Sequence, residues 1–230
     1  MICENTFLSM NEQVIYEDEA FMVFLKRPGQ DSEKIPAILG DNKLKVVNRL
    51  DMPVGGLILV GKNASSCANL NRQIEQKTLL KEYYAVVAGK MEEINGELND
   101  YLLHDKSKNK SFPVSSARKG VKDATLLYRV LAYNDASDLS LVKVRPITGR
   151  THQIRVQFAS RKHPLCGDGK YGSKVKGQIA LFSGDVLFEH PNKKTPLHYH
   201  ASPLDTDNEI WSLFDYNWNE YSLIKSSSVQ

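Results

Sequence analysis

The run Arg49-Leu50-Asp51 is the segment of this sequence whose residue types point most directly to chemistry. It stands just before Pro53 and a pair of glycines, at the front of residues 46–63, VVNRLDMPVGGLILVGKN. Catalytic carboxylates are often found on loops of this kind, where proline and glycine constrain the backbone. Taken alone, however, Asp51 could simply cap a turn.

A second polar run lies at residues 148–155, TGRTHQIR, where Arg150, His152 and Arg155 surround the start of an expected helix. Tyr83, in the strand-like run KEYYAVV, adds a phenol. Read singly, each of these residues also has an ordinary structural explanation, as a solvated charge or as a core residue with its hydroxyl at the edge.

The end of the first run resembles a phosphate-binding loop, because Gly56 is followed after four residues by Gly61 and Lys62. Such a loop needs a flexible backbone and then a serine or threonine that binds magnesium. The four intervening residues, Leu-Ile-Leu-Val, favour a strand, and Asn63 takes the place of the hydroxyl residue. We therefore expect a strand here and no nucleotide cofactor.

Four residues could form a soft-metal set. His198 and His200 would share one face of a strand, and His163 and Cys166 could add further ligands. No third ligand lies at a diagnostic spacing, so we expect no metal site.

Hydrophobic patterns predict a mainly β structure. Residues 13–29 have the pattern of a hairpin with an acidic turn, and residues 57–60 that of a short buried strand. Asn63 is placed to cap a following helix. Further strands are expected at residues 79–89, 124–133 and 138–146.

Thr151 is predicted to N-cap a helix that reaches about residue 161, with Ile154 and Phe158 on one face and His152 and Arg155 on the other. Residues 104–122 are rich in Lys, Ser and Gly, which predicts a long mobile loop. Together, these elements predict one α/β (α+β) domain, with a mainly antiparallel mixed sheet flanked by a few helices and loops.

The composition sets outer limits. The 230 residues are 41% hydrophobic and 25% charged, which suits one large domain or two small ones. No apolar run approaches the ~20 residues that span a bilayer, and the first residues have no basic start typical of a secretory signal. Cys3, Cys67 and Cys166 are widely spaced and odd in number, which indicates reduced thiols in a cytoplasmic protein.

The net charge of +3 is small, but the charges are segregated. Residues 143–172 contain seven basic residues and one acidic residue, and residues 104–123 contain six and two, whereas the last thirty residues are acidic. Such a pattern can mark a binding surface for a polyanion such as RNA. Solvated loops and helix faces explain it equally well.

Together, these segments resemble the RluA-type family of RNA pseudouridine synthases. Residues 48–57 match the family's signature loop, His-Arg-Leu-Asp followed by two variable residues, Thr or Val, Ser or Gly, and Gly. A Lys-Pro-Pro-Gly-like turn is matched by residues 26–29, and a Lys-x-Tyr strand by residues 81–83. The Thr-Gly-Arg-Thr-His-Gln-Ile-Arg block is intact at residues 148–155, and a His-Pro-Leu-x-Gly-Asp-x-x-Tyr-Gly segment is matched by residues 163–172.

The matches follow the family's order over residues 13–205. We therefore expect an N-terminal tail at residues 1–12, a catalytic domain at residues 13–218 and a C-terminal tail at residues 219–230. Asn48 replaces the histidine that the family usually has here, at a position that neighbours the reacting residues but does not supply the nucleophile. The part of the chain that matches the family begins near residue 13, so we expect no S4-type RNA-binding domain before it. Substrate choice should then rest on the catalytic domain.

The resemblance implies isomerisation of uridine to pseudouridine within RNA, after the base leaves its stack. Asp51 would be the essential carboxylate, either as a nucleophile or as the base that starts a glycal route. Arg155 would keep this carboxylate ionised. Tyr83 would pack against the uracil and is the candidate base for its C5 proton. Since a phenol with an ordinary pKa of about 10 is a weak base at neutral pH, the base role of this tyrosine stays open.

The resemblance also implies contacts with RNA. Arg49 would fill the space vacated by the flipped base, and Arg150, His152 and Gln153 would hold phosphate or backbone beside it. The basic stretch at residues 106–122 would close on the RNA, through Lys106, Lys108 and Lys110. No cofactor or metal is expected, because the reaction involves no redox change and no external nucleophile.

The main alternative is a non-catalytic RNA-binding protein on the same fold, for which Asp51→Asn would change nothing. A P-loop NTPase is the other class, and it would show magnesium-dependent ATP binding. The combination of Arg49, Asp51, Tyr83 and Arg155 favours the synthase. Whether its RNA is ribosomal or transfer RNA stays open, and size and family favour a monomer.

Overall fold

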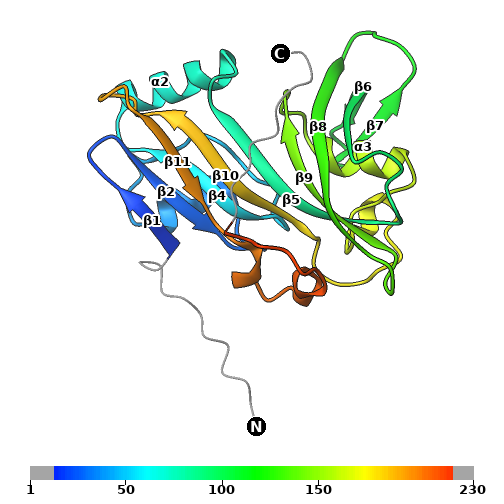
Figure 1. The fold of residues 1–230 in the computed structure, drawn as a ribbon. Helices are drawn as coiled ribbons and strands as arrows, with labels where there is room; N and C mark the ends of the chain where they lie inside the picture. Colours follow the sequence, from blue (N-terminus) through cyan, green and yellow to red (C-terminus); the bar gives the residue numbers. More distant parts are fainter. Residues whose placement is uncertain (1–12, 220–230) are drawn as a thin grey trace. The chain divides into compact units, whose positions relative to one another are not determined.

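The computed structural model describes residues 13–219. They form an α+β fold with a mostly antiparallel arrangement of strands and few helices (Figure 1), which confirms the predicted fold class. The chain divides into two compact units. Of the described residues, 13–80 and 186–201 form the first unit, and 81–185 and 202–219 form the second.

The first unit begins with the predicted hairpin. Strands β1 (Val14–Glu17) and β2 (Phe21–Lys26) pair antiparallel, and β2 pairs antiparallel with β4 (Gly55–Gly61). The short β3 (Lys45–Val46) also pairs with β4. The other elements are η2 (Ser32–Lys34), α1 (Ile35–Ile38), α2 (Ala64–Glu75), β11 (Pro196–His200) and the end of β10 (Leu181–Glu189).

Strand β4 confirms the interpretation of the glycine-flanked apolar run as a buried strand, since all its residues are buried. Leu57 and Leu59 belong to a core cluster with Phe21. A Cβ atom on Gly61 would lie 2.3 Å from the Sγ atom of Cys67, so α2 packs closely against β4 and a larger residue here would displace the Cys67 side chain. Asn63 caps α2 as predicted, accepting a hydrogen bond from the first turn of the helix.

The second unit contains a run of antiparallel neighbours in the order β5-β9-β8-β6-β7. These strands are β5 (Leu80–Ala88), β6 (Asn95–Asp105), β7 (Lys110–Val114), β8 (Val121–Asn134) and β9 (Leu139–Pro146). The other elements are α3 (Gln153–Ser160), η3 (Gly169–Tyr171), η4 (Pro203–Asp205), η5 (Glu209–Leu213) and the start of β10. The strands predicted at residues 79–89, 124–133 and 138–146 are therefore confirmed.

A buried ionic network joins β5, β9 and β10. The Nζ atom of Lys143 lies 3.2 Å from a carboxylate oxygen of Glu82 and 3.2 Å from one of Asp185. Arg145 donates two hydrogen bonds to the other oxygen of Glu82, at 3.0 and 2.7 Å. Because successive side chains of a strand point to opposite faces, Tyr83 faces away from this network.

The last described segment of the chain contributes an aromatic cluster to the second unit. The ring of Trp218 lies 5.3 Å from that of Tyr84 in β5, and 5.1 and 6.0 Å from those of Tyr216 and Trp211. Both tryptophans are buried. The cluster fixes the segment that follows η5 against β5.

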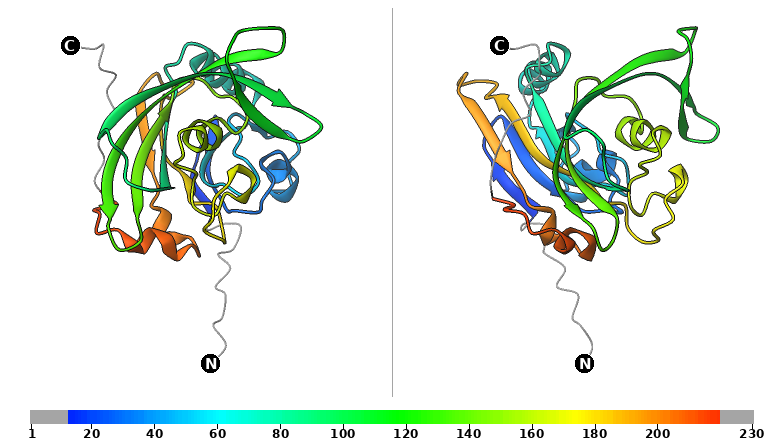
Figure 2. Two further views of the ribbon diagram at one scale, coloured as in Figure 1. Left: turned by 90° about the vertical axis from the view of Figure 1, so that its right-hand side faces the viewer. Right: turned by 45° about the vertical axis from the view of Figure 1, so that its right-hand side comes forward.

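The prediction of a long mobile loop at residues 104–122 is wrong. Strand β7 pairs with β6 along its whole length, and β8 then begins at Val121, so the region is a β-hairpin and a second turn (Figure 2). Leu103 and Phe112 face each other across the hairpin. A few such pairs on one side of a hairpin are enough when the other side is solvated, so a low apolar content did not exclude strands here.

The predicted start of the helix at residues 151–161 is wrong. Helix α3 begins after His152, so His152 and not Thr151 occupies the N-cap position, with a left-handed φ of 56° and no side-chain capping bond. All residues from 153 to 158 are buried, so Arg155 does not lie on a solvated face. The polar residues of this helix are paired inside the protein.

Helix α2, with 12 residues, is the longest helix in the described part of the chain. No helix in residues 13–219 has the length and apolar character needed to cross a bilayer.

Candidate active site

In the first unit, Asp51 starts a tight turn that a buried lysine holds in place. The turn is closed by a hydrogen bond of 2.9 Å from the backbone nitrogen of Val54 to the carbonyl oxygen of Asp51. Lys26, which is 1% exposed, donates through Nζ to the carbonyl oxygens of Arg27, Met52 and Val54, at 3.0, 3.1 and 2.6 Å. One ammonium group therefore fixes the backbone on both sides of the turn.

The charge of Lys26 also matters to the site. Burial lowers the pKa of Lys26 to about 8, because the charged form loses hydration. The negative charges of Asp51 and Asp31 oppose this shift. The carboxylate of Asp51 thus interacts electrostatically with the ammonium group of Lys26, which belongs to the same unit. With a pKa of about 8, Lys26 is mostly charged at neutral pH.

The approach to the turn is held as firmly. The hydroxyl group of Ser32 donates to the carbonyl oxygen of Leu50 at 3.0 Å and accepts from its backbone nitrogen at 3.1 Å. Asn48 is buried, and its side-chain oxygen accepts a hydrogen bond of 2.7 Å from the backbone nitrogen of Leu59 in β4. The asparagine that replaces the family's histidine therefore ties the loop to a buried strand.

Arg49 lies on the exposed side of the same loop. Its side chain is 68% exposed and pairs with Glu33 of η2, which is 64% exposed. An ion pair between two such exposed groups contributes little to stability. Arg49 can therefore exchange Glu33 for another partner at small cost.

In the second unit, Arg155 is held in a fork. Its Nε and Nη2 atoms donate to the two carboxylate oxygens of Asp168, at 2.7 and 2.8 Å, and both residues are buried. This bidentate geometry sets the plane of the guanidinium group. Tyr83 is buried in β5, where it is the partner of Val144 in β9.

Gln153 uses its side chain to shape the loop before α3. Its Nε2 atom donates to the carbonyl oxygen of Thr125 at 2.9 Å, and its Oε1 atom accepts from the hydroxyl group of Thr148 and the backbone nitrogen of Arg150, at 2.8 and 3.0 Å. The Nε atom of Arg150 donates to the carbonyl oxygen of Asp123. The structure thus brings these predicted RNA-contact residues together, with Gln153 inside the loop.

His152 joins the same region through a residue to which sequence reasoning assigned no role. Its Nδ1 atom lies 2.9 Å from the hydroxyl oxygen of Tyr171, and both side chains are buried. Asp168 and Tyr171 both belong to the matched segment at residues 163–172. The polar residues of this glycine-rich segment could have marked it as a candidate part of the site. Their partners, Arg155 and His152, become evident only in the folded structure.

The hairpin lysines differ from one another. Lys106 and Lys108 are exposed at the tip of the β6–β7 hairpin. Lys110 is half-buried and donates through Nζ to the carbonyl oxygen of Lys170 at 2.6 Å. The first two are therefore presented to solvent, whereas Lys110 attaches the hairpin to η3.

The candidate metal ligands have other partners. The rings of His198 and His200 are 6.5 Å apart on β11, and His163 lies 2.8 Å from the carbonyl oxygen of Ala88. Burial raises the pKa of the Cys166 thiol to about 11. Within residues 13–219, no group of three or more His, Cys, Asp or Glu side chains is arranged to hold a metal ion.

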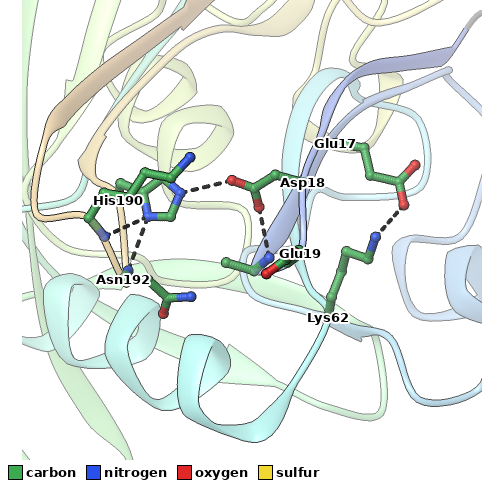
Figure 3. A pocket seen from close by; sticks show the side chains of 8 residues that line it. Glu17, Asp18, Glu19, Lys62, His190 and Asn192 are labelled. Carbon is green, nitrogen blue, oxygen red and sulfur yellow. Dashed lines mark hydrogen bonds and ion pairs between the residues drawn. The ribbon is translucent and has the colours of Figure 1, made fainter.

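A further polar pocket in the first unit is shown in Figure 3. There, Asp18 accepts hydrogen bonds from the backbone nitrogens of Ala20 and Phe21, at 2.7 and 3.0 Å, and from Nε2 of His190, at 2.8 Å. The Nδ1 atom of His190 in turn accepts from the backbone nitrogens of Asn192 and Lys193. This Asp18–His190 clasp joins the β1–β2 turn to the turn after β10, which is a structural role.

The fold and the loop can be compared with known proteins. The family described as RNA pseudouridylate synthase matches residues 23–160. The chain is 39% identical over 151 residues to an uncharacterized RNA pseudouridine synthase of Bacillus subtilis, which covers 65% of this chain and 49% of that protein. It is 30% identical over 224 residues to the ribosomal large subunit pseudouridine synthase C of Pasteurella multocida, which covers 88% of this chain and 68% of that protein.

Among solved structures, human RNA pseudouridylate synthase domain containing 1 shares the fold, with a TM-score of 0.70 at 20% identity over 82% of each chain. The chain therefore belongs to the family of RNA pseudouridylate synthases, the class of enzymes that isomerise uridine to pseudouridine in RNA. This confirms the resemblance to the RluA-type synthases. The chain spans about half the length of the Bacillus subtilis relative.

Proposed function

We propose that this chain isomerises uridine to pseudouridine within RNA and that Asp51 is its essential carboxylate. The observation that carries the proposal is the fixed Asp51 turn. Lys26 and Ser32 hold the backbone on both sides of Asp51, so the chain that carries this carboxylate is preorganised. Preorganisation of a reacting group is what a demanding rearrangement at a sugar carbon requires.

The reaction balances without a cofactor. The bond between N1 of uracil and C1′ of the ribose breaks, the base turns, and a bond forms between C5 and C1′. The C5 proton then leaves and N1 gains a proton, so the atoms of substrate and product are the same. Asp51 either attacks C1′ as a nucleophile or removes the proton from C2′ to open a glycal route.

Arg155 and Tyr83 complete the proposed site. Asp51 belongs to the first unit, whereas Arg155 and Tyr83 belong to the second. Arg155 keeps the carboxylate ionised, with its guanidinium group already set by Asp168. Tyr83 packs against the uracil and is the candidate base for the C5 proton.

RNA binding is assigned to the exposed cations. Arg49 enters the space left by the base, and Arg150 with the backbone around His152 holds the phosphates beside it. Gln153 acts through Arg150, whose backbone nitrogen it binds. The hairpin lysines Lys106, Lys108 and Lys110 bind the RNA backbone further away.

The substrate to test first is large-subunit ribosomal RNA, because the Pasteurella multocida relative is named for it. Transfer RNA is the other candidate. Such substrates place the proposed enzyme in the cytoplasm, and we propose that it acts as a monomer, which size-exclusion chromatography with light scattering would test.

The decisive experiment incubates the protein with unmodified ribosomal and transfer RNA transcripts. Pseudouridines are mapped by carbodiimide labelling and primer extension, and rates are followed by tritium release from [5-³H]uridine. We expect site-specific modification by the wild type and a loss of at least about a thousandfold in Asp51→Asn. The matched control Asp41→Asn, an exposed carboxylate of the same unit, should modify like the wild type.

Two outcomes would overturn the proposal. One is RNA that the wild type binds but never modifies, which would favour the non-catalytic RNA-binding alternative. The other is an Asp51→Asn variant that modifies as fast as the wild type.

A further inference from the structure

The hydroxyl group of Tyr171 lies where three segments of the second unit meet. The backbone nitrogen of Ser111 in β7 donates to it at 2.9 Å, and Nδ1 of His152, just before α3, lies 2.9 Å away. Tyr171 itself belongs to η3. Because its side chain is buried, this hydroxyl is satisfied inside the protein and connects the β6–β7 hairpin, α3 and η3.

The Tyr171 hydroxyl group serves both neighbours at once. The Ser111 amide supplies its hydrogen to the phenol oxygen, and the same hydroxyl group makes the contact with Nδ1 of His152. The position of the His152 ring is thus tied to a residue that also contacts the hairpin.

The ring of Tyr171 contacts two cations. The guanidinium carbon of Arg155 lies 5.2 Å from the ring centroid, and the Nζ atom of Lys110 lies 5.1 Å from it. Both distances are within the range of cation–π attraction. Asp168 and Tyr171 therefore fix the Arg155 guanidinium group together. Asp168 accepts two hydrogen bonds from the edge of the group, and the Tyr171 ring attracts its positive charge.

Further bonds attach the hairpin to the same segments. Lys110 donates to the carbonyl oxygen of Lys170, and Lys170 donates back to the carbonyl oxygen of Asn109, at 2.6 and 2.9 Å. The hydroxyl group of Ser111 donates to the carbonyl oxygen of Thr151 at 2.6 Å. A displacement of the hairpin therefore acts on η3 and on the residue pair that precedes α3.

We propose that Asp168 and Tyr171 are positioning residues that couple RNA contact by the β6–β7 hairpin to the orientation of Arg155 and His152. The inference rests on the proposed function, in which Arg155 supports Asp51 and the hairpin binds RNA. RNA phosphates that bind the hairpin tip hold the hairpin in one position. Through its contacts with Ser111, His152 and Arg155, Tyr171 then holds the start of α3 in a matching position. Isomerisation is then fastest on RNA that also reaches the hairpin.

The first test separates positioning from binding. Tyr171→Phe keeps the ring and removes only the hydroxyl group. At saturating RNA, we expect the single-turnover rate to fall about tenfold, while the Kd for RNA changes far less. Asp168→Asn removes the charge that orients Arg155 and should lower the rate about a hundredfold. The control Tyr133→Phe removes a hydroxyl group from β8 at the β8–β9 turn, where it donates to Asp138, and should leave rate and Kd unchanged.

The second test measures the coupling itself. The double variant Lys106→Gln, Lys108→Gln, called the tip variant, should weaken RNA binding and also lower the saturated rate. In a Tyr171→Phe background, the same two changes should weaken binding but leave the rate unaltered, because the link is already broken. An equal fractional loss of rate in both backgrounds would overturn the coupling.

The outcomes also distinguish this inference from the proposed function. Inactive wild type, or fully active Asp51→Asn, refutes the function and the coupling with it. Active wild type with inactive Asp51→Asn, but with Tyr171→Phe as fast as wild type, refutes the coupling alone. If Tyr171→Phe fails to fold, Asp168→Asn releases the Arg155 guanidinium group from its fixed orientation, and the tip variant should then lose its effect on the rate. A persisting effect on the rate would overturn the proposal.

Discussion

The position of Asp51 depends most directly on Lys26. The buried ammonium group satisfies three carbonyl oxygens, and those of Met52 and Val54 lie in the turn that begins at Asp51. Burial alone would favour the neutral amine, and Asp51 itself helps to retain the proton. The Asp51 turn and its anchor Lys26 therefore stabilise each other through opposite charges.

Replacement of this anchor should loosen the first unit. We expect Lys26→Met to lower the free energy of unfolding by about 2–4 kcal/mol, because three carbonyl groups lose their donor inside the protein. The saturated rate of isomerisation should fall as well. Urea denaturation followed by far-ultraviolet circular dichroism measures the first effect, with the exposed Lys43→Met as control. Equal unfolding midpoints for Lys26→Met and wild type would contradict this role.

Asp51 and Arg49 could be selected as candidate site residues because they stand together in one contiguous run of the sequence. The Arg155–Asp168 fork and the Tyr171 hydroxyl could not be assigned roles in the same way. Their partners depend on how η3 folds back on α3, and a residue spacing in the sequence carries no information on that contact. The motif at residues 163–172 was visible, but its physical purpose was not.

At the scale of elements, the Asp18–His190 clasp joins two turns of the first unit. Desolvation acts to raise the pKa of Asp18, but hydrogen bonds from the backbone of Ala20 and Phe21 and from His190 outweigh it and lower the pKa to about 2. The unfolded chain therefore binds a proton at higher pH than the folded chain does. This carboxylate stabilises the fold above pH 4, and that contribution is lost as the pH falls from 4 to 2.

This clasp gives a pH-dependent prediction. The stability difference between wild type and Asp18→Asn should shrink by roughly 2 kcal/mol between pH 5 and pH 2. Urea denaturation across this range, followed by circular dichroism, gives the difference at each pH. Glu19→Gln, an exposed carboxylate of the same turn, is the control and should show no such trend. A constant difference for Asp18→Asn would argue against the clasp.

Most strands were predictable because runs of β-branched and aromatic residues mark them. The β6–β7 hairpin was missed because its strands carry serines and lysines, and pairing with a neighbouring strand stabilises it more than its own composition does. The helix start was missed because His152 adopts a left-handed backbone, which its contact with Tyr171 supports. In both places tertiary contacts overrode local preference.

At the scale of the whole chain, the segregated positive charge is partly internal. Lys143, Arg145 and Arg155 are buried and paired with carboxylates, so they add little to an external field. The count of basic residues at 143–172 therefore overstated the RNA-binding surface. The exposed lysines at the hairpin tip are better candidates for that role.

The tip variant should reveal this surface through salt. Removing Lys106 and Lys108 should reduce the slope of log Kd against log salt concentration by about 1.4, as expected for two contacts with single-stranded phosphates. Fluorescence anisotropy of labelled RNA at several salt concentrations measures the slope. Lys193→Gln with Lys194→Gln removes the same charge from an exposed turn of the first unit. An unchanged slope in the tip variant, or an equal change in this control, would count against the hairpin.

The location of the two tryptophans has a practical consequence for spectroscopy. Trp211 and Trp218 are the only tryptophans in the sequence, and both lie in the second unit, where Trp218 contacts Tyr84 and Trp211 contacts Trp218. Intrinsic tryptophan emission therefore reports on the second unit. The first unit, which carries Asp51, has no tryptophan of its own. A melting curve recorded by tryptophan emission could therefore indicate a folded protein after the Asp51 turn has already unfolded. A tryptophan introduced near β2 would report on that turn directly.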